Sequence, residues 1–349
     1  MSIESTAQSN SSASSARRIG YVGHDAPIEL VLAAGAIPVG VHGVAGRDTP
    51  RADQYVEPTF SPASRSIAEQ WLSGELDELE AVVFSRSDDS AQRLYYYLCE
   101  LQRRGLCRGP KPLLYDVATW NRDSSLAHTI ASTRQLAREL GAADDALPGA
   151  IERVHERFDL LASAAESTLA SQPARGSFAQ GLVRAADRDW SERGDAMLRA
   201  AQDPSPAPHE APRLMLMGSA PADERLHEAA ERAGANIVAT LTEATPRRVA
   251  RAALQGDAHE QIARRCRAHS WREALQAPDA FADRATALGV SGVILWTVKE
   301  DAGLAWAAPR IERALRARGL SVLTLAMQPW NVAADALDAI AAFSAQLRS

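Results

Sequence analysis

Polar residues that can take part in acid–base chemistry or ligand binding follow four apolar runs of the sequence. His24 and Asp25 follow the run 19–22, Ser87 and Asp88 follow the run 81–84, and the other two polar stretches are 218–219 and 299–301. If the runs are parallel strands of two sheets that face each other, these side chains converge in the cleft beyond the carboxyl ends of the strands, where ligands of such folds bind. The competing interpretation is that each stretch forms turns and helix caps, which Ser and Asp favour.

Two of these residues have the chemistry of a catalytic group. His24 stands at the start of a predicted helix and could serve as an acid or base, and Glu29 lies one turn into the same helix. A capping histidine and an N-terminal helix charge are the structural alternatives. The carboxylates at 88–89 and 300–301 suit a hard cation such as Mg²⁺, although acidic pairs also complement helix dipoles.

Arg65 and Arg86 are candidates for binding an anionic group, because a guanidinium presents paired donors to phosphate or carboxylate. The chain contains 38 Lys and Arg residues, so the alternative for each is an ordinary solvated side chain.

Apolar runs alternate with segments of helical periodicity along most of the chain. This alternation predicts an α/β fold of two Rossmann-like or flavodoxin-like lobes, each with a small parallel sheet, joined by a helical connector. We expect a disordered tail at 1–17, an N-terminal lobe at 18–145, the connector at 146–201, a proline-rich linker at 202–212 and a C-terminal lobe at 213–349. The expected strands are 19–22, 37–41, 81–84, 112–117, 214–218, 236–240, 292–298 and 321–327.

Composition excludes several classes of function. The 349 residues carry a net charge of −6 with no basic stripe, which argues against a nucleic-acid partner. The three cysteines form neither a disulfide framework nor a zinc pattern, and no apolar run is long enough for a membrane span, so we expect a cytoplasmic protein. Walker, GxGxxG, HExxH and GxSxG motifs are absent.

Four segments together resemble the 2-hydroxyacyl-CoA dehydratase and benzoyl-CoA reductase family. GYVGHDAPIELVLAAGAIPVGVHG (20–43) is similar to the family's opening strand and Pro-x-Glu-Leu helix. FSPASRS (60–66) is similar to its Cys-Pro-x-x-Arg segment, FSRSDDS (84–90) to its strand-end Cys-Asp, and GVILWTVKED (292–301) to the late strand before its third cysteine.

The resemblance implies a [4Fe–4S] cluster held by three thiolates, but this chain has Ser61, Ser87 and Glu300 at the three positions. Hydroxyl and carboxylate oxygens are poor substitutes for thiolate as ligands of such a cluster. We therefore expect no cofactor and no bound metal. By the same resemblance, Glu29 lies near the active site, and Arg65, Arg86 and Asp88 join the replaced positions in binding a ligand.

Two classes of function follow, and the sequence leaves open whether the chain is an enzyme. The first is a cluster-less subunit that binds an acyl-CoA-like ligand or pairs with a cluster-bearing subunit in dehydration of an (R)-2-hydroxyacyl-CoA. The second is a non-catalytic binding or scaffolding homologue. Pairing, with a homologous subunit or as a homodimer, could use the C-terminal helix and the apolar residues of the connector, which include Phe158, Leu160, Leu161 and Leu169. The alternative is that these residues cover the chain's own sheets.

Overall fold

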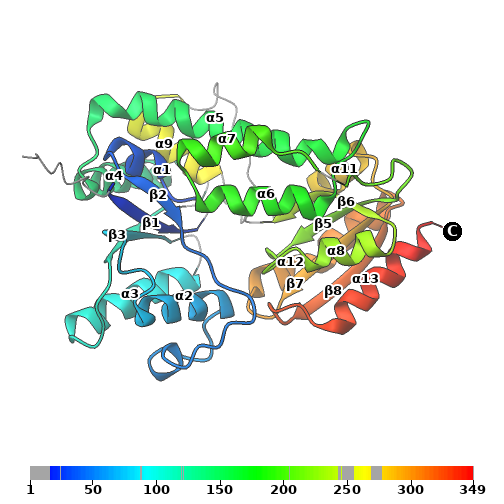
Figure 1. Cartoon of the computed structure of the whole chain (residues 1–349), viewed down its shortest axis with the longest axis horizontal. Coiled ribbons are helices and arrows are strands. Elements are labelled where there is room, and N and C mark those ends of the chain that lie inside the picture. Colours follow the sequence, from blue (N-terminus) through cyan, green and yellow to red (C-terminus); the bar gives the residue numbers. More distant parts are fainter. Residues whose placement is uncertain are drawn as a thin grey trace, which may run out of the picture.

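Two four-stranded parallel sheets form the centre of the molecule (Figure 1). The computed structural model describes residues 16–23, 25–86, 89–118, 120, 122–203, 205–242, 245, 255–268 and 277–348. The sheets have the orders β2-β1-β3-β4 and β6-β5-β7-β8, so both lobes have the same topology. The strands are β1 (Arg18–Val22), β2 (Ile37–Gly40), β3 (Ala81–Ser85), β4 (Lys111–Tyr115), β5 (Arg213–Gly218), β6 (Asn236–Thr242), β7 (Gly292–Val298) and β8 (Ser321–Gln328).

Helices follow the strands and cover both faces of each sheet. The α-helices of the described residues are α1 (Ile28–Ala33), α2 (Pro62–Ser73), α3 (Asp89–Arg103), α4 (Asp123–Leu140), α5 (Leu147–Glu166), α6 (Gly176–Arg188), α7 (Glu192–Ala200), α8 (Arg225–Arg232), α9 (Ala258–Ala268), α11 (Pro278–Ala287), α12 (Ala302–Ala317) and α13 (Ala334–Gln346). The predicted α/β class with two lobes is confirmed. The predicted tail lies outside the described residues up to residue 15, as do parts of the helical region expected at 246–275.

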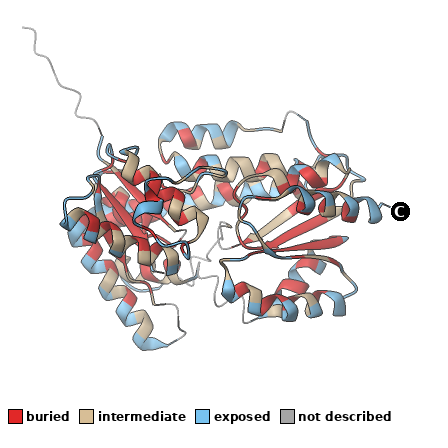
Figure 2. Cartoon of the chain, turned by 90° about the horizontal axis from the view of Figure 1, so that it is seen from below, coloured by how far each residue is buried: buried red, intermediate tan, exposed pale blue. Residues whose placement is uncertain are grey.

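Alternate residues of each strand enter different cores. In β3, Ala81 and Val83 pack with α1 and α4, whereas Val82 and Phe84 pack with α2 and α3. The second sheet is built in the same way, with α11 and α12 on one face and α8 and α13 on the other. Burial on both faces explains why the inner strands β1, β3, β5 and β7 are continuous apolar runs. Figure 2 shows most strand residues buried and the outer sides of the helices exposed.

The connector helices α5, α6 and α7 are tied to the first sheet by a polar network. The hydroxyl of Tyr21 on β1 donates to Asp187 Oδ1 at 2.6 Å, and the indole N–H of Trp190 donates to that hydroxyl at 2.9 Å. His42 Nε2 lies 2.6 Å from Asp187 Oδ2. Burial, with Asp187 close by, raises the pKa of Tyr21 well above its ordinary value, so the phenol stays protonated and able to donate.

Three of the connector's apolar residues pack inside the molecule, whereas Leu160 is half-buried and Met197 is exposed. Leu161 is buried, and Phe158 packs against the first core with its ring 6.5 Å from that of Trp190. Leu169 packs against the core of the second lobe. Of the two alternatives left by the sequence, cover of the chain's own sheets accounts for these residues, so they supply no argument for a pairing surface.

One helix of the C-terminal half packs with the N-terminal lobe. Helix α9 follows β6 in the sequence, yet Ile262 and Cys266 belong to the core beneath α1 and α4. Arg134 on α4 also pairs with Asp257, just before α9, at 2.6 Å. The chain therefore passes from the second lobe to the first and returns at α11. No helix among the described residues is long and apolar enough to cross a membrane.

A buried histidine in the second lobe predicts an acid-sensitive stability. His227 on α8 has its Nε2 2.8 Å from Thr240 Oγ1, and burial, with Arg184 nearby, lowers its pKa from 6.5 to about 3. Between these values the unfolded chain binds a proton that the folded chain excludes. The free energy of unfolding should therefore fall by up to ~1.4 kcal/mol per pH unit as the pH drops through this window.

Urea unfolding of the chain and of His227→Gln across this pH range is the measurement. The substitution keeps a polar partner for Thr240 and removes the titrating group, so the variant should lose less stability on acidification than the parent. Parallel pH profiles for the two proteins would contradict the assignment.

Candidate functional site

The carboxyl ends of the strands in the first lobe meet a buried cluster of ionisable groups. Gly23 and Asp25 follow β1, Ser85 ends β3, and Tyr115 ends β4. Asp25, Ser85 and Tyr115 are each at most 4% exposed. Because all four strands are parallel, these groups lie at the edge where open α/β sheets bind ligands. Arg265 of α9 reaches the same cluster from the other half of the chain.

Glu29 and Arg265 form an ion pair in which both side chains are 1% exposed. Arg265 Nη2 donates to Glu29 Oε2 at 2.7 Å and to the Ala26 carbonyl at 2.9 Å, and Nε donates to Glu29 Oε1. The guanidinium thus binds the carboxylate through two nitrogens and also bonds the backbone carbonyl of Ala26, just before α1. Both carboxylate oxygens of Glu29 accept hydrogen bonds from Arg265. In this structure Glu29 therefore serves to fix α9 against α1.

The groups around the ion pair are held neutral. Burial raises the pKa of the Cys266 thiol to about 12, and the carboxylates of Glu29 and Asp25 act in the same direction, whereas Arg265 opposes them. Burial also raises the pKa of Tyr115 well above its ordinary value. The Tyr115 hydroxyl lies 3.0 Å from that of Thr133. Cys266 is accordingly a protonated core thiol at neutral pH, without the thiolate character of a nucleophile.

Ser61 and Arg65 serve local structure in α2. Ser61 is the N-cap, and its hydroxyl accepts from the Ser64 N–H at 3.2 Å. Arg65, one turn later, pairs with Asp53 of the short helix η1 (Ala52–Gln54). The cap interpretation therefore holds for Ser61. Close to this turn the lobes meet, since a methyl group built on Gly43 would lie 2.9 Å from Trp330 Cη2 of the second lobe.

Arg86 follows β3 directly and is neutralised by a neighbour. Its Nη1 donates to Asp116 Oδ1 at 2.7 Å, and His128 Nε2 lies 3.0 Å from the other oxygen of Asp116. The side chain of Arg86 is 49% exposed, so part of its donor fork still faces solvent. An anionic ligand could bind there without first displacing Asp116.

Glu300 lies after β7 in the second lobe, where Asp301 and Ser219 organise the loop. Asp301 is the N-cap of α12 and accepts from the Leu304 N–H at 2.9 Å, and the Ser219 hydroxyl donates to Asp301 at 3.3 Å. Glu300 Oε1 is 3.7 Å from Lys299 Nζ, and Oε2 is buried with no hydrogen-bond partner among the described residues. The described residues contain no group of three or more His, Cys, Asp or Glu side chains placed to hold a metal ion.

The remaining predicted residues, His24, Ser87 and Asp88, lie outside the described residues. The structure places Glu29 beside the carboxyl edge of the first sheet and Arg86 on that edge, and Ser61 and Glu300 cap or border helices of different lobes. Sequence reasoning missed Arg265, because a partner 236 positions from Glu29 leaves no local signal. The available hint was the position of Arg265 among Ile262, Ala263 and Cys266, which form the apolar face of the helix.

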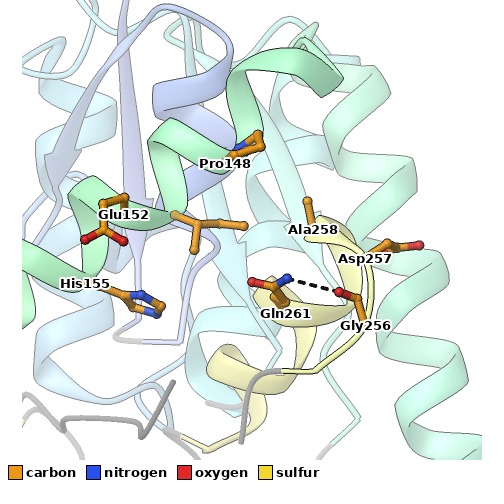
Figure 3. Close-up of a pocket in the computed structure, with 8 residues that line it drawn as sticks. Pro148, Glu152, His155, Gly256, Asp257, Ala258 and Gln261 are labelled. Atoms are coloured by element: carbon orange, nitrogen blue, oxygen red, sulfur yellow. Dashed lines mark hydrogen bonds between the residues drawn. The ribbon is translucent and has the colours of Figure 1, made fainter. Parts of the chain in front are cut away.

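Two surface pockets lie away from the predicted residues. One, of about 360 Å³, lies between α5 and the start of α9, with Glu152 and His155 on one wall and Asp257 and Gln261 on the other (Figure 3). Gln261 donates to the Gly256 carbonyl at 3.0 Å across its floor. The second, of about 500 Å³, borders β8 and α13. Neither contains a predicted site residue, so the ionisable cluster remains the candidate site.

The buried ion pair predicts a non-additive mutational effect on stability. Glu29→Gln leaves Arg265 as an uncompensated buried charge, and Arg265→Met does the same to Glu29, so each should cost about 3–5 kcal/mol of unfolding free energy. The double variant Glu29→Gln/Arg265→Met removes both charges and should lose clearly less than the sum of the single losses.

Urea denaturation of the four proteins tests this. Glu260→Gln is the matched control, because it breaks the partly exposed Glu260–Arg264 pair of the same helix and should cost less than about 1 kcal/mol. Additive losses in the double variant would show that the two side chains act independently.

Comparison with known proteins places the chain in a family. No curated protein matches it. A solved structure described as the SBP FpvC from Pseudomonas aeruginosa in complex with Mn2+ shares 15% identity over 96% of this chain and 98% of that chain, with a TM-score of 0.24. That score is too low to support any argument about the fold. The family model for 2-hydroxyglutaryl-CoA dehydratase, D-component, matches residues 24–343, which include both sheets except β1. The chain therefore belongs to the 2-hydroxyglutaryl-CoA dehydratase D-component family.

Proposed function

We propose that this chain is a subunit of the 2-hydroxyacyl-CoA dehydratase type that binds a CoA thioester but carries no iron–sulfur cluster of its own. The observation that carries the proposal is the family match over both lobes, combined with oxygen donors at the positions where the resemblance expects cysteines. A subunit of this kind would keep the ligand-binding edge and leave the redox step to another component. We expect it to act in the cytoplasm.

The donor set does not fit a [4Fe–4S] cluster. The Ser61 hydroxyl is engaged as a helix cap, and Glu300 offers a hard carboxylate. The three cysteines lie elsewhere, with Cys99 on α3, Cys107 just after α3 and Cys266 buried in the first core. We therefore assign no step of the reaction to a cluster on this chain.

A partner subunit follows from the same reasoning. The family is named for a component, and a chain without cluster ligands needs a cluster-bearing subunit if dehydration is to occur. The second candidate is a non-catalytic scaffold. It would pair with the same partner subunit but would not bind a CoA thioester. Binding of a CoA thioester distinguishes the two.

The first prediction concerns iron. After anaerobic reconstitution with iron and sulfide, the chain should hold no stoichiometric iron, because thiolates are absent from the expected ligand positions. The triple variant Ser61→Cys/Ser87→Cys/Glu300→Cys restores the soft ligands and should gain iron, acid-labile sulfide and the visible absorption of a cluster. About four irons per chain in the parent protein would contradict the proposal.

The second prediction concerns the ligand. Calorimetric titration with 2-hydroxyglutaryl-CoA should give a Kd below about 1 mM, and Arg86→Ala should weaken binding about tenfold because a charge-assisted contact is lost. Arg103→Ala is the matched control, since Arg103 lies at the opposite end of α3 in an exposed pair with Glu100. If no CoA ester binds, the scaffold candidate is favoured instead.

A further inference from the structure

Asp25 is a buried carboxyl group without a hydrogen-bond partner among the described residues. The residue is 4% exposed, and neither Oδ1 nor Oδ2 is bonded to any part of the chain that the structure describes. Its neighbour Glu29 is equally buried, but both of its oxygens are bonded by Arg265. Buried carboxylates are normally paired, because removing an unpaired charge from water costs several kcal/mol. The burial of Glu29 is explained by its pairing with Arg265, whereas the burial of Asp25 is not explained by any contact among the described residues.

The carboxylate is turned toward the carboxyl edge of the first sheet. A methyl group built on Gly23 would lie 3.2 Å from Asp25 Oδ1 and 3.0 Å from Ser85 Cβ. Gly23 has a φ of +101°, a conformation that other residues rarely adopt, so the chain turns sharply at the end of β1. This turn brings Asp25 back over the ends of β1 and β3, where parallel sheets bind ligands.

Hydrogen-bond partners are unevenly shared within the described cluster. Glu29 and Arg265 bind each other, and the thiol of Cys266 and the phenol of Tyr115 are uncharged because burial raises the pKa of each. Asp25 is the carboxyl group left without a hydrogen-bond partner among the described residues. The guanidinium of Arg265 is committed to Glu29, Ala26 and Cys266, although its Nη1 is also buried without a partner in the described part of the chain.

We propose that Asp25 is the specificity-determining residue of the ligand site and accepts a hydrogen bond from the 2-hydroxyl group of the bound CoA thioester. A carboxyl oxygen without a partner accepts a hydrogen bond from a ligand group that presents a donor. The hydroxyl distinguishes a 2-hydroxyacyl chain from the corresponding acyl chain, which leaves both oxygens of Asp25 unpaired. This inference rests on the proposed function, because it takes the ligand to be a CoA thioester.

A stability comparison tests the state of Asp25 without any ligand. Removing a buried carboxyl group whose oxygens lack partners should stabilise the free protein, so Asp25→Leu should raise the midpoint of thermal unfolding by about 2 °C or more. Glu29→Gln is the matched control and should lower it, since it unpairs Arg265. If Asp25→Leu melts below the parent, Asp25 is a structural carboxyl group and the inference is wrong.

A binding comparison tests the specificity. The parent should bind 2-hydroxyglutaryl-CoA about tenfold or more tightly than glutaryl-CoA, because an unpaired buried acceptor penalises the ester without the hydroxyl. In Asp25→Leu the two affinities should become equal, with that for glutaryl-CoA retained. An unchanged ratio in the variant overturns the inference while leaving thioester binding intact. If the parent binds neither ester, the proposed function fails, and the role of Asp25 fails with it.

Discussion

The ion pair between Glu29 and Arg265 determines how the two halves of this chain are joined. A guanidinium and a carboxylate that are each 1% exposed can persist only if they satisfy each other and the backbone around them, and here they also hold the Ala26 carbonyl. The pair fixes α9, which arrives from the second lobe, against α1 of the first. The turn after β1 and the start of α1 are therefore positioned by a residue more than 200 positions away.

The same arrangement explains why the candidate site is asymmetric. Each lobe has a sheet with the same strand order, and in each the polar loops follow the strands at the carboxyl edge. In the second lobe that edge is occupied by ordinary loop structure, with Asp301 capping α12 and Ser219 bonded to Asp301. In the first lobe, α9 brings the buried Arg265 to the edge, where it pairs with Glu29 and leaves Asp25 without a partner among the described residues. The two sheets therefore have the same strand order, and the packing of α9 against the first lobe accounts for the asymmetry of the candidate site.

The type of donor atom at Ser61, Ser87 and Glu300 decides which metal centres these side chains could bind. A serine that caps a helix already uses its hydroxyl to satisfy a backbone N–H, as Ser61 does, and a carboxylate such as Glu300 prefers hard cations. Membership of the dehydratase family and the absence of soft ligands at these positions are thus compatible.

The sequence by itself determined the two α/β lobes and the eight strands of the described residues, because strands buried on both faces must be apolar runs and helices between them must show a helical period. It also determined that Ser61, Ser87 and Glu300 carry oxygen donors. Tertiary structure alone decided that Arg65 and Arg86 pair with Asp53 and Asp116, and that Phe158, Leu161 and Leu169 pack inward. It also decided that Arg265 binds Glu29, whereas Asp25 has no hydrogen-bond partner among the described residues. The physical reason is that periodicity records whether a residue is buried but not which charge lies opposite it, and a charge's partner is set by contacts between segments far apart in the chain.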